Sequence, residues 1–126
     1  MKKVTVGRFE IPVSDMDRAI SFYQKVFDCS LTKIDMGDFQ MAMFPGEGGG
    51  VGAEGSLVSH KDFYKSSNLA GVLIYFSSVD LSIELAKVEE AGGNVQIPKR
   101  MISPEYGYMG VFLDSEGNRI ALHSMS

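Results

Sequence analysis

The amino-acid sequence predicts an α+β fold in which a βαβββ module occurs twice. Residues 8–27 alternate like a strand and then change to helical spacing. The same strand-to-helix pattern returns after a shift of 65 residues, over residues 72–91. Each pattern is followed by segments that alternate again, as strands do. Because one module is too small to bury its own sheet well, we expect the two modules to share a core.

The first strand is predicted over residues 2–13, and its two faces differ in chemistry. Side chains alternate between the faces of a strand. The apolar face consists of Phe9, Ile11 and Val13. Arg8 and Glu10 share the opposite face, so we expect that face to line a wet space.

Helices are predicted over residues 15–27 and 81–91, where apolar residues recur at helical spacing. Asp15 and Asp80 stand at the starts of these segments. Aspartate is a good N-cap because its carboxylate accepts hydrogen bonds from the free amides of the first turn. Gly92 follows the second segment and suits a C-cap, since it has no Cβ.

The other strands of the first module are predicted at residues 31–36, 39–44 and 56–59, with a hairpin turn at Gly37. Residues 46–55 contain six glycines. They lack the lysine and serine of a phosphate-binding P-loop. A flexible hairpin loop beside a cavity mouth is therefore the preferred interpretation.

The second module repeats this order, with strands predicted at residues 72–78, 95–97, 106–113 and 119–123. Proline cannot donate to a strand ladder, so Pro98 and Pro104 are expected to limit pairing around the second of these strands.

The chain is predicted to form a single domain over residues 1–126. Module one covers about residues 1–59 and module two about residues 71–126. The polar stretch at about residues 60–70 is interpreted as the linker between them.

Composition excludes several classes of protein. With 126 residues and 44% hydrophobic residues, the chain has ample material for a core. The formal charge of −4 and the lack of a basic stripe argue against nucleic-acid binding. A single cysteine fits a reducing compartment. No apolar run is long enough for a signal sequence or a membrane span, so a cytoplasmic protein without a membrane partner is predicted.

The duplicated plan and one turn motif together resemble a known superfamily. The motif is Asp114-x-Glu116-Gly117-Asn118-Arg119-Ile120, directly before the last strand. This combination resembles the vicinal oxygen chelate superfamily, which includes glyoxalase I, bleomycin-resistance proteins, fosfomycin-resistance enzymes and extradiol dioxygenases. The resemblance implies that each sheet curls into a half-barrel around a cavity, with the helices outside. It also implies a homodimer, which unpaired strand edges would favour. Whether modules pair within one chain or across two stays open.

In metal-dependent members of that superfamily, ligands come from the first and last strands of the modules. The resemblance places these positions at Arg8, Ser56, Leu73 and Ala121. None of these residue types is a usual ligand for a divalent metal, and the arginine would repel one. His123 and Glu10 would make only a partial ligand set. We therefore expect no metal ion and no other cofactor.

Arg8 and Glu10 allow two interpretations. They are two residues apart on one face and could simply form a buried ion pair. Alternatively, Arg8 binds a carboxylate or enolate oxygen with its planar fork. Glu10 would then hold the guanidinium, or act as a base if burial raised its pKa.

Three further residues complete the predicted ligand site. Tyr75 and His123 are expected to point into the cavity by strand alternation, and Tyr108 is expected to border its mouth. For each the alternative is ordinary packing or an ordinary surface position.

Two functions fit this set of residues. The preferred one is a metal-independent protein of the glyoxalase and bleomycin-resistance type. It would bind a small organic ligand with Arg8, Glu10, Tyr75, Tyr108 and His123. The alternative is a lyase or isomerase that acts on a vicinal dioxygen compound such as a dicarbonyl, with Glu10 or His123 as the proton carrier. The sequence leaves open whether a reaction is catalysed and which ligand is bound.

Overall fold

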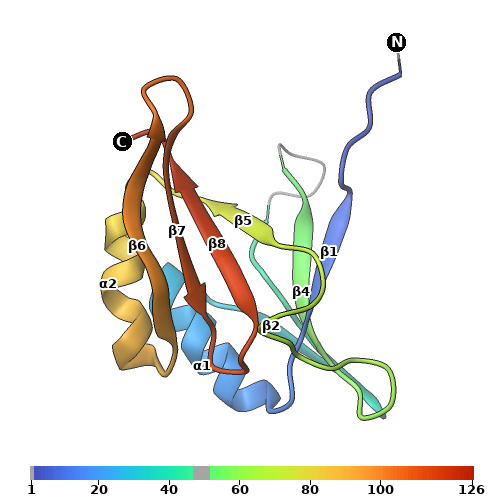
Figure 1. Cartoon of the computed structure of the whole chain (residues 1–126). Coiled ribbons are helices and arrows are strands. Elements are labelled where there is room, and N and C mark those ends of the chain that lie inside the picture. Colours follow the sequence, from blue (N-terminus) through green and yellow to red (C-terminus); the bar gives the residue numbers. More distant parts are fainter. Residues whose placement is uncertain (1, 47–51) are drawn as a thin grey trace.

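The computed structural model describes residues 2–46 and 52–126, which fold into two open four-stranded sheets and two helices (Figure 1). Module one contains β1 (Arg8–Pro12), α1 (Met16–Phe27), β2 (Thr32–Met36), β3 (Phe39–Met43) and β4 (Glu54–Ser59). Module two contains β5 (Ile74–Ser77), α2 (Leu81–Ala91), β6 (Asn94–Ser103), β7 (Gly107–Leu113) and β8 (Arg119–Ser124). The predicted α+β fold of two βαβββ modules is confirmed.

The duplication extends to the strand register. The sheets have the orders β1-β4-β3-β2 and β5-β8-β7-β6. In each sheet the first strand is parallel to the last strand of its module. Ile11 lies opposite Leu57 in one sheet, and Phe76 lies opposite Leu122 in the other. Adding 65 to the first pair gives the second, so the shift found in the sequence is also the structural repeat.

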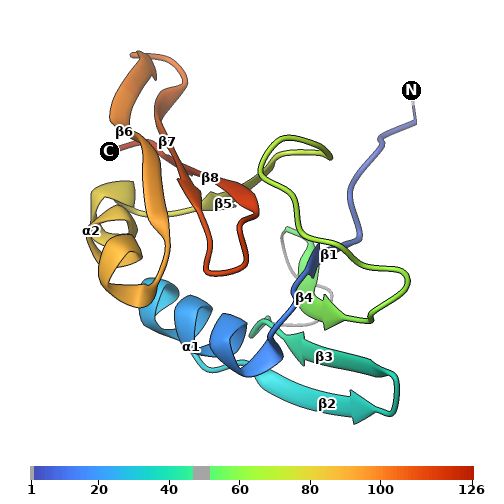
Figure 2. The ribbon, with the colours of Figure 1, turned by 60° about the horizontal axis from the view of Figure 1, so that its bottom comes forward.

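The two modules share a core. α1 contacts β3 and β4, α2 contacts β6, β7 and β8, and the two helices also contact each other (Figure 2). The rings of Phe9 in β1 and Phe76 in β5 meet edge to face, with centroids 5.6 Å apart. One continuous cluster of buried apolar residues includes both helices. Each sheet therefore keeps its other, concave face free of helices.

Both predicted helix starts are confirmed at their caps. The Asp15 carboxylate accepts from the amide of Arg18 at 3.1 Å, and the Asp80 carboxylate accepts from the amide of Ser82 at 3.0 Å. Gly92 ends α2 in the left-handed region at φ 109°.

Two predicted strands have different limits in the structure. β1 begins at Arg8 and not at residue 2, because its register with β4 starts where Arg8 lies opposite Glu54. β6 is a ten-residue strand that runs through Pro98, where a strand over residues 95–97 was predicted. β6 is an edge strand with register shifts on either side of this proline. An edge strand tolerates a missing N–H because one side of its ladder is unpaired.

The predicted glycine-rich loop falls mainly on residues 47–51, which lie outside the described residues, whereas Glu54 and Gly55 already belong to β4. Among the described residues no helix combines the length and the apolar character that a membrane span requires.

The turn between β7 and β8 joins module two to the start of α1. The Glu116 carboxylate accepts from the amides of Ser14 at 2.9 Å and Asp15 at 2.8 Å, and from Arg18 Nε at 2.7 Å. The Glu116 side chain is 0% exposed. We call these contacts, together with those of Asp114 and Asn118, the inter-module clamp.

Asp114 and Asn118 complete the inter-module clamp. The Tyr23 hydroxyl of α1 donates to Asp114 at 2.6 Å, and the Asn118 amide nitrogen donates to the Pro12 carbonyl at 2.7 Å. Burial raises the pKa of Asp114, against the opposing effect of the hydrogen bonds from Tyr23 and Asn118. The motif that carries the family resemblance is therefore a joint between the modules.

We predict that Glu116→Ala lowers the free energy of unfolding by roughly 2 kcal/mol, because it removes several charge-assisted hydrogen bonds. Denaturant unfolding of the variant and the wild type measures this difference. Glu90→Gln is the matched control, because the Glu90 side chain is 76% exposed and pairs only loosely with Lys25. An equal effect of both substitutions would contradict the role assigned to Glu116.

The stabilisation by Glu116 should depend on pH. Burial raises the pKa of Glu116, but hydrogen bonds from Arg18, Asp15, Ser115 and Ser14 outweigh burial and bring the pKa from 4.5 to about 2. A lowered folded-state pKa gives stabilisation that is present above pH 4.5 and is lost as the pH falls toward 2. Unfolding measured across this range should show the gap between wild type and Glu116→Gln narrowing with acid. A constant gap would contradict the prediction.

Candidate functional site

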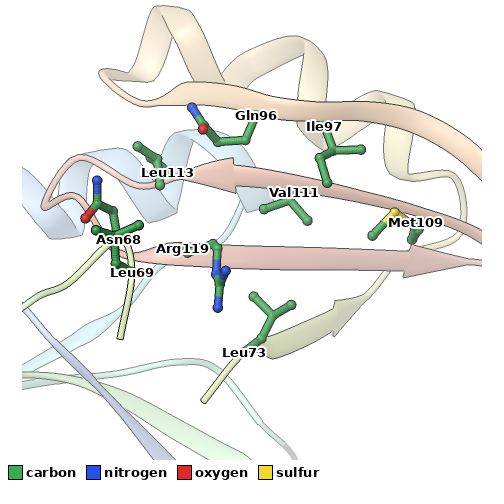
Figure 3. Close-up of a pocket in the computed structure, with 9 residues that line it drawn as sticks. All are labelled: Asn68, Leu69, Leu73, Gln96, Ile97, Met109, Val111, Leu113 and Arg119. Atoms are coloured by element: carbon green, nitrogen blue, oxygen red, sulfur yellow. The ribbon is translucent and has the colours of Figure 1, made fainter. Parts of the chain in front are cut away.

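A cavity of about 370 Å³ lies on the concave face of the module-two sheet (Figure 3). Six apolar side chains line it, namely Leu69, Leu73, Ile97, Met109, Val111 and Leu113. Three polar side chains also line it: Arg119 from β8, Gln96 from β6 and Asn68 from the linker. Cavities of this kind, mostly apolar with few polar groups, are typical of small-molecule sites.

Arg119 is the charged group of this cavity. It is the first residue of β8, directly after the clamp residue Asn118, and its guanidinium projects toward the space beside Leu73 (Figure 3). The ion pairs among the described residues join other side chains, so Arg119 has no carboxylate partner there. Its five N–H donors remain available to an anion.

Arg119 also borders a second cavity, of about 240 Å³, at the junction of the modules. Glu10 and Pro12 of β1, Lys65 of the linker and Asn118 contribute to its wall. This arrangement places one anionic and two cationic side chains around the same small space.

Arg8 and Glu10 do not form an ion pair with each other in the described structure. Both are exposed, and the described ion pairs do not include either residue. Glu10 instead accepts a hydrogen bond of 2.6 Å from the Tyr64 hydroxyl of the linker. Arg8 lies opposite Glu54 in the register of β1 and β4. The alternative of a buried Arg8–Glu10 ion pair is therefore wrong.

Tyr75 and His123 lie on the strands that form the module-two face. Tyr75 is 50% exposed and lies opposite Ala121, and His123 lies opposite Met109. His123 Nε2 is 2.6 Å from the Tyr106 carbonyl oxygen. Since a carbonyl only accepts, this contact favours the tautomer with the proton on Nε2. Neither side chain is part of the cavity wall around Arg119.

Tyr108 lies on the opposite side of the same sheet. Its strand partner Ser124 faces α2, where the Ser124 hydroxyl accepts from the Leu81 amide at 3.2 Å. The Tyr108 ring packs against the core, and Lys99 Nζ lies 4.7 Å from its centroid. Tyr108 therefore does not line the Arg119 cavity, and Met109, the next residue, lines it instead.

The four residues at the superfamily's metal-ligand positions do not fit a divalent ion. Arg8, Ser56, Leu73 and Ala121 supply one cation, one hydroxyl and two apolar groups. Within residues 2–46 and 52–126 no group of three His, Cys, Asp or Glu side chains is placed to hold a metal. The Ser56 hydroxyl is buried and lacks a hydrogen-bond partner in the described structure.

Sequence reasoning missed Arg119 and Tyr64. Arg119 could have been found, because it precedes Ala121 by two residues and strand alternation puts both on one face. Tyr64 carried no signal, since it lies in a linker without periodicity.

Comparisons with known proteins give a consistent result. A family model for the Glyoxalase/Bleomycin resistance protein/Dioxygenase superfamily matches residues 5–122. A search of curated protein sequences found no match. TnmS3, an antibiotic binding protein from Streptomyces sp. CB03234, is 25% identical to this chain, with a TM-score of 0.70 over 100% of this chain and 99% of that one.

Two further structures resemble the fold. A glyoxylase/bleomycin resistance protein/dioxygenase domain from Frankia sp. EAN1pec is 17% identical, with a TM-score of 0.74 over 98% of this chain and 93% of that one. Glyoxalase I from Zea mays is 16% identical, with a TM-score of 0.71 over 98% of this chain and 48% of that one. The chain thus spans about half the length of the maize enzyme.

The residue types at the superfamily's metal-ligand positions lead to a prediction about metal content. Protein purified without chelator should carry far less than one equivalent of zinc, nickel, iron or manganese per chain. Elemental analysis measures this directly. One tightly held equivalent would show that other side chains build a metal site, and the assignment of the cavity would have to be revised.

Proposed function

This chain belongs to the Glyoxalase/Bleomycin resistance protein/Dioxygenase superfamily, and from that premise we propose that it binds a small organic ligand carrying an anionic group, without a metal ion. Small-molecule binding at the level of the family agrees with the antibiotic binding protein among its structural relatives. The proposed site is the concave face of the module-two sheet.

The observation that supports this proposal is the guanidinium of Arg119 in a mostly apolar cavity. The walls formed by residues such as Ile97, Met109 and Val111 would bury the body of a ligand. The planar guanidinium would accept a carboxylate, sulfonate or phosphate in a bidentate geometry. Met109 adds an adaptable wall that suits ligands of varied outline.

Arg8, the arginine suggested by the sequence, has a different place in this proposal. It lies on β1 of module one, outside the cavity wall that contains Arg119. Arg119 takes over the anion-binding role, while the position of Arg8 at the superfamily's metal site still disfavours a metal ion.

The lyase or isomerase alternative receives less support. Its two proposed proton carriers both have partners in the structure: Glu10 accepts from Tyr64, and His123 contacts the Tyr106 carbonyl. The larger cavity, where a substrate would be held, is lined by neither of them, and Glu10 meets Arg119 only at the smaller cavity. Binding is therefore the conclusion that the geometry favours.

A homodimer is part of the proposal. β2 is an edge strand whose five residues are all exposed, and it presents Ile34 at 41% and Met36 at 63% exposure. Exposed apolar strand edges favour association with a second copy. Sedimentation of a clean monomer at micromolar concentration would remove this part.

The binding proposal is tested with 8-anilino-1-naphthalenesulfonate, an anionic aromatic probe, and with N-phenyl-1-naphthylamine, its neutral analogue. Arg119→Gln should weaken binding of the anionic probe by about tenfold or more, the usual effect of losing a charge-assisted hydrogen bond. Binding of the neutral analogue should change little. Fluorescence titration measures both affinities.

Arg100→Gln serves as the control, because it removes a positive charge from the same module without touching either cavity. Equal losses for both probes, or equal losses in the two variants, would contradict an anion site at Arg119. Native mass spectrometry of the purified protein would identify any ligand retained from the cell.

A further inference from the structure

The concave faces of the two sheets differ in how far they are exposed to solvent. Val58 of β4 corresponds to His123 of β8 under the 65-residue shift, and each lies on the concave face of its sheet. Val58 is 0% exposed, whereas His123 is only partly buried. Something in the chain therefore covers the concave face of module one where the face of module two is hollow.

Tyr64 of the linker lies on the concave side of the module-one sheet. Its hydroxyl donates to Glu10 on β1 at 2.6 Å, and its ring meets Phe39 on β3 edge to face with centroids 6.0 Å apart. β4 lies between β1 and β3 in this sheet. Tyr64 therefore contacts the strands on both sides of β4, at residues that share the concave face with Val58.

The segment that carries Tyr64 is a closed turn resting on the same face. The Tyr64 amide donates to the His60 carbonyl at 3.2 Å, and the Asp62 amide donates to His60 Nδ1 at 3.1 Å. The His60 ring is 4.5 Å from that of Phe39. Phe63, in contrast, is 75% exposed. Tyr64 is thus presented to Glu10 by a short, locally stabilised turn.

Beneath Tyr64 the sheet offers polar chemistry that the chain itself does not use fully. Ser56 lies opposite Glu10 on the same face, is 0% exposed, and its hydroxyl has no hydrogen-bond partner among the described residues. A buried hydroxyl without a partner is costly and rare. The half-buried Met41 and Met43 stand beside it on β3.

We infer that the concave face of module one is a second ligand site, which takes a flat phenol-bearing compound, and that Tyr64 occupies it as an internal stand-in. A phenolic ligand would displace the Tyr64 ring, donate its hydroxyl to Glu10 and stack against Phe39. Ser56 would supply the second hydrogen bond that Tyr64 leaves unmade. The wall of the larger Arg119 cavity does not include Glu10, Ser56 or Tyr64, whereas Glu10 and Arg119 both line the smaller cavity at the junction of the modules.

The charge of the site favours a neutral phenol. The hydrogen bond to Glu10 is the largest cause that raises the pKa of Tyr64, followed by burial and the charge of Glu10, while Arg8 lowers it. A phenol held by a carboxylate keeps its proton, since the phenolate would be repelled. The ligand class therefore differs from the anions proposed for Arg119.

The test uses 2-naphthol as the phenolic probe and 2-methoxynaphthalene as its analogue without a donor hydrogen. Tyr64→Ala should tighten 2-naphthol binding by about tenfold, because an internal competitor lowers apparent affinity by the fraction of time the site is filled. The gain should be smaller for the methoxy analogue. Adding Glu10→Gln should abolish the gain for 2-naphthol.

Three comparisons keep the test decisive. Phe63→Ala, in the same turn but exposed, should leave both affinities unchanged. Tyr64→Phe keeps the ring and loses the bond to Glu10, so a smaller gain is expected even if the alanine variant fails to fold. Arg100→Gln, at a residue that lines neither cavity, should not alter 2-naphthol binding. The inference is overturned if neither Tyr64 variant tightens binding, or if both probes gain equally with no dependence on Glu10.

Discussion

The carboxylate of Glu116 is the contact on which the arrangement of the two modules depends. The Glu116 side chain is fully buried in the last hairpin of module two. It accepts hydrogen bonds from Ser14 and Asp15, just before α1, and from Arg18 in the first turn of α1. Tyr23 and Asn118 add two more bonds between the modules. The shared apolar core supplies most of the buried area, but it is not directional. The inter-module clamp fixes the angle at which the two sheets meet.

The same turn places the candidate ligand site. Arg119 follows Asn118 directly, so the turn that forms the inter-module clamp also fixes the backbone position from which the Arg119 side chain extends. Asn118 additionally accepts from the Ser67 amide at 3.2 Å, which holds the linker just before Asn68 and Leu69 reach the cavity. In the motif that relates the chain to its superfamily, the acidic residues Asp114 and Glu116 thus have a structural role. Its connection with the proposed ligand site is Arg119, the residue that follows Asn118.

Much of this fold could be predicted from the sequence because the signals are local. Asp15 and Asp80 cap their helices, and the repeat of 65 residues sets the strand order. What failed depended on neighbours that are distant in the chain. Pro98 shifts the register of β6 but does not end the strand, because β6 is an edge strand. Glu10 accepts a hydrogen bond from Tyr64, which lies in the linker and is distant in the chain. Strand alternation, applied from Ala121 to Arg119, would have found the cation of the cavity.

Duplication gave the chain two similar concave faces, and charge now distinguishes them. On module two the Arg119 guanidinium, which has no carboxylate partner among the described residues, is the group that we propose attracts anions. On module one a carboxylate meets a phenol, and anions would have to approach Glu10 against its charge. Arg8 weakens that repulsion but lies at the far end of the β1 segment, away from the cavity of Arg119. The two proposed sites would thus select ligands of different charge within one fold, because a few alternate residues of each strand determine the chemistry of one face of the sheet.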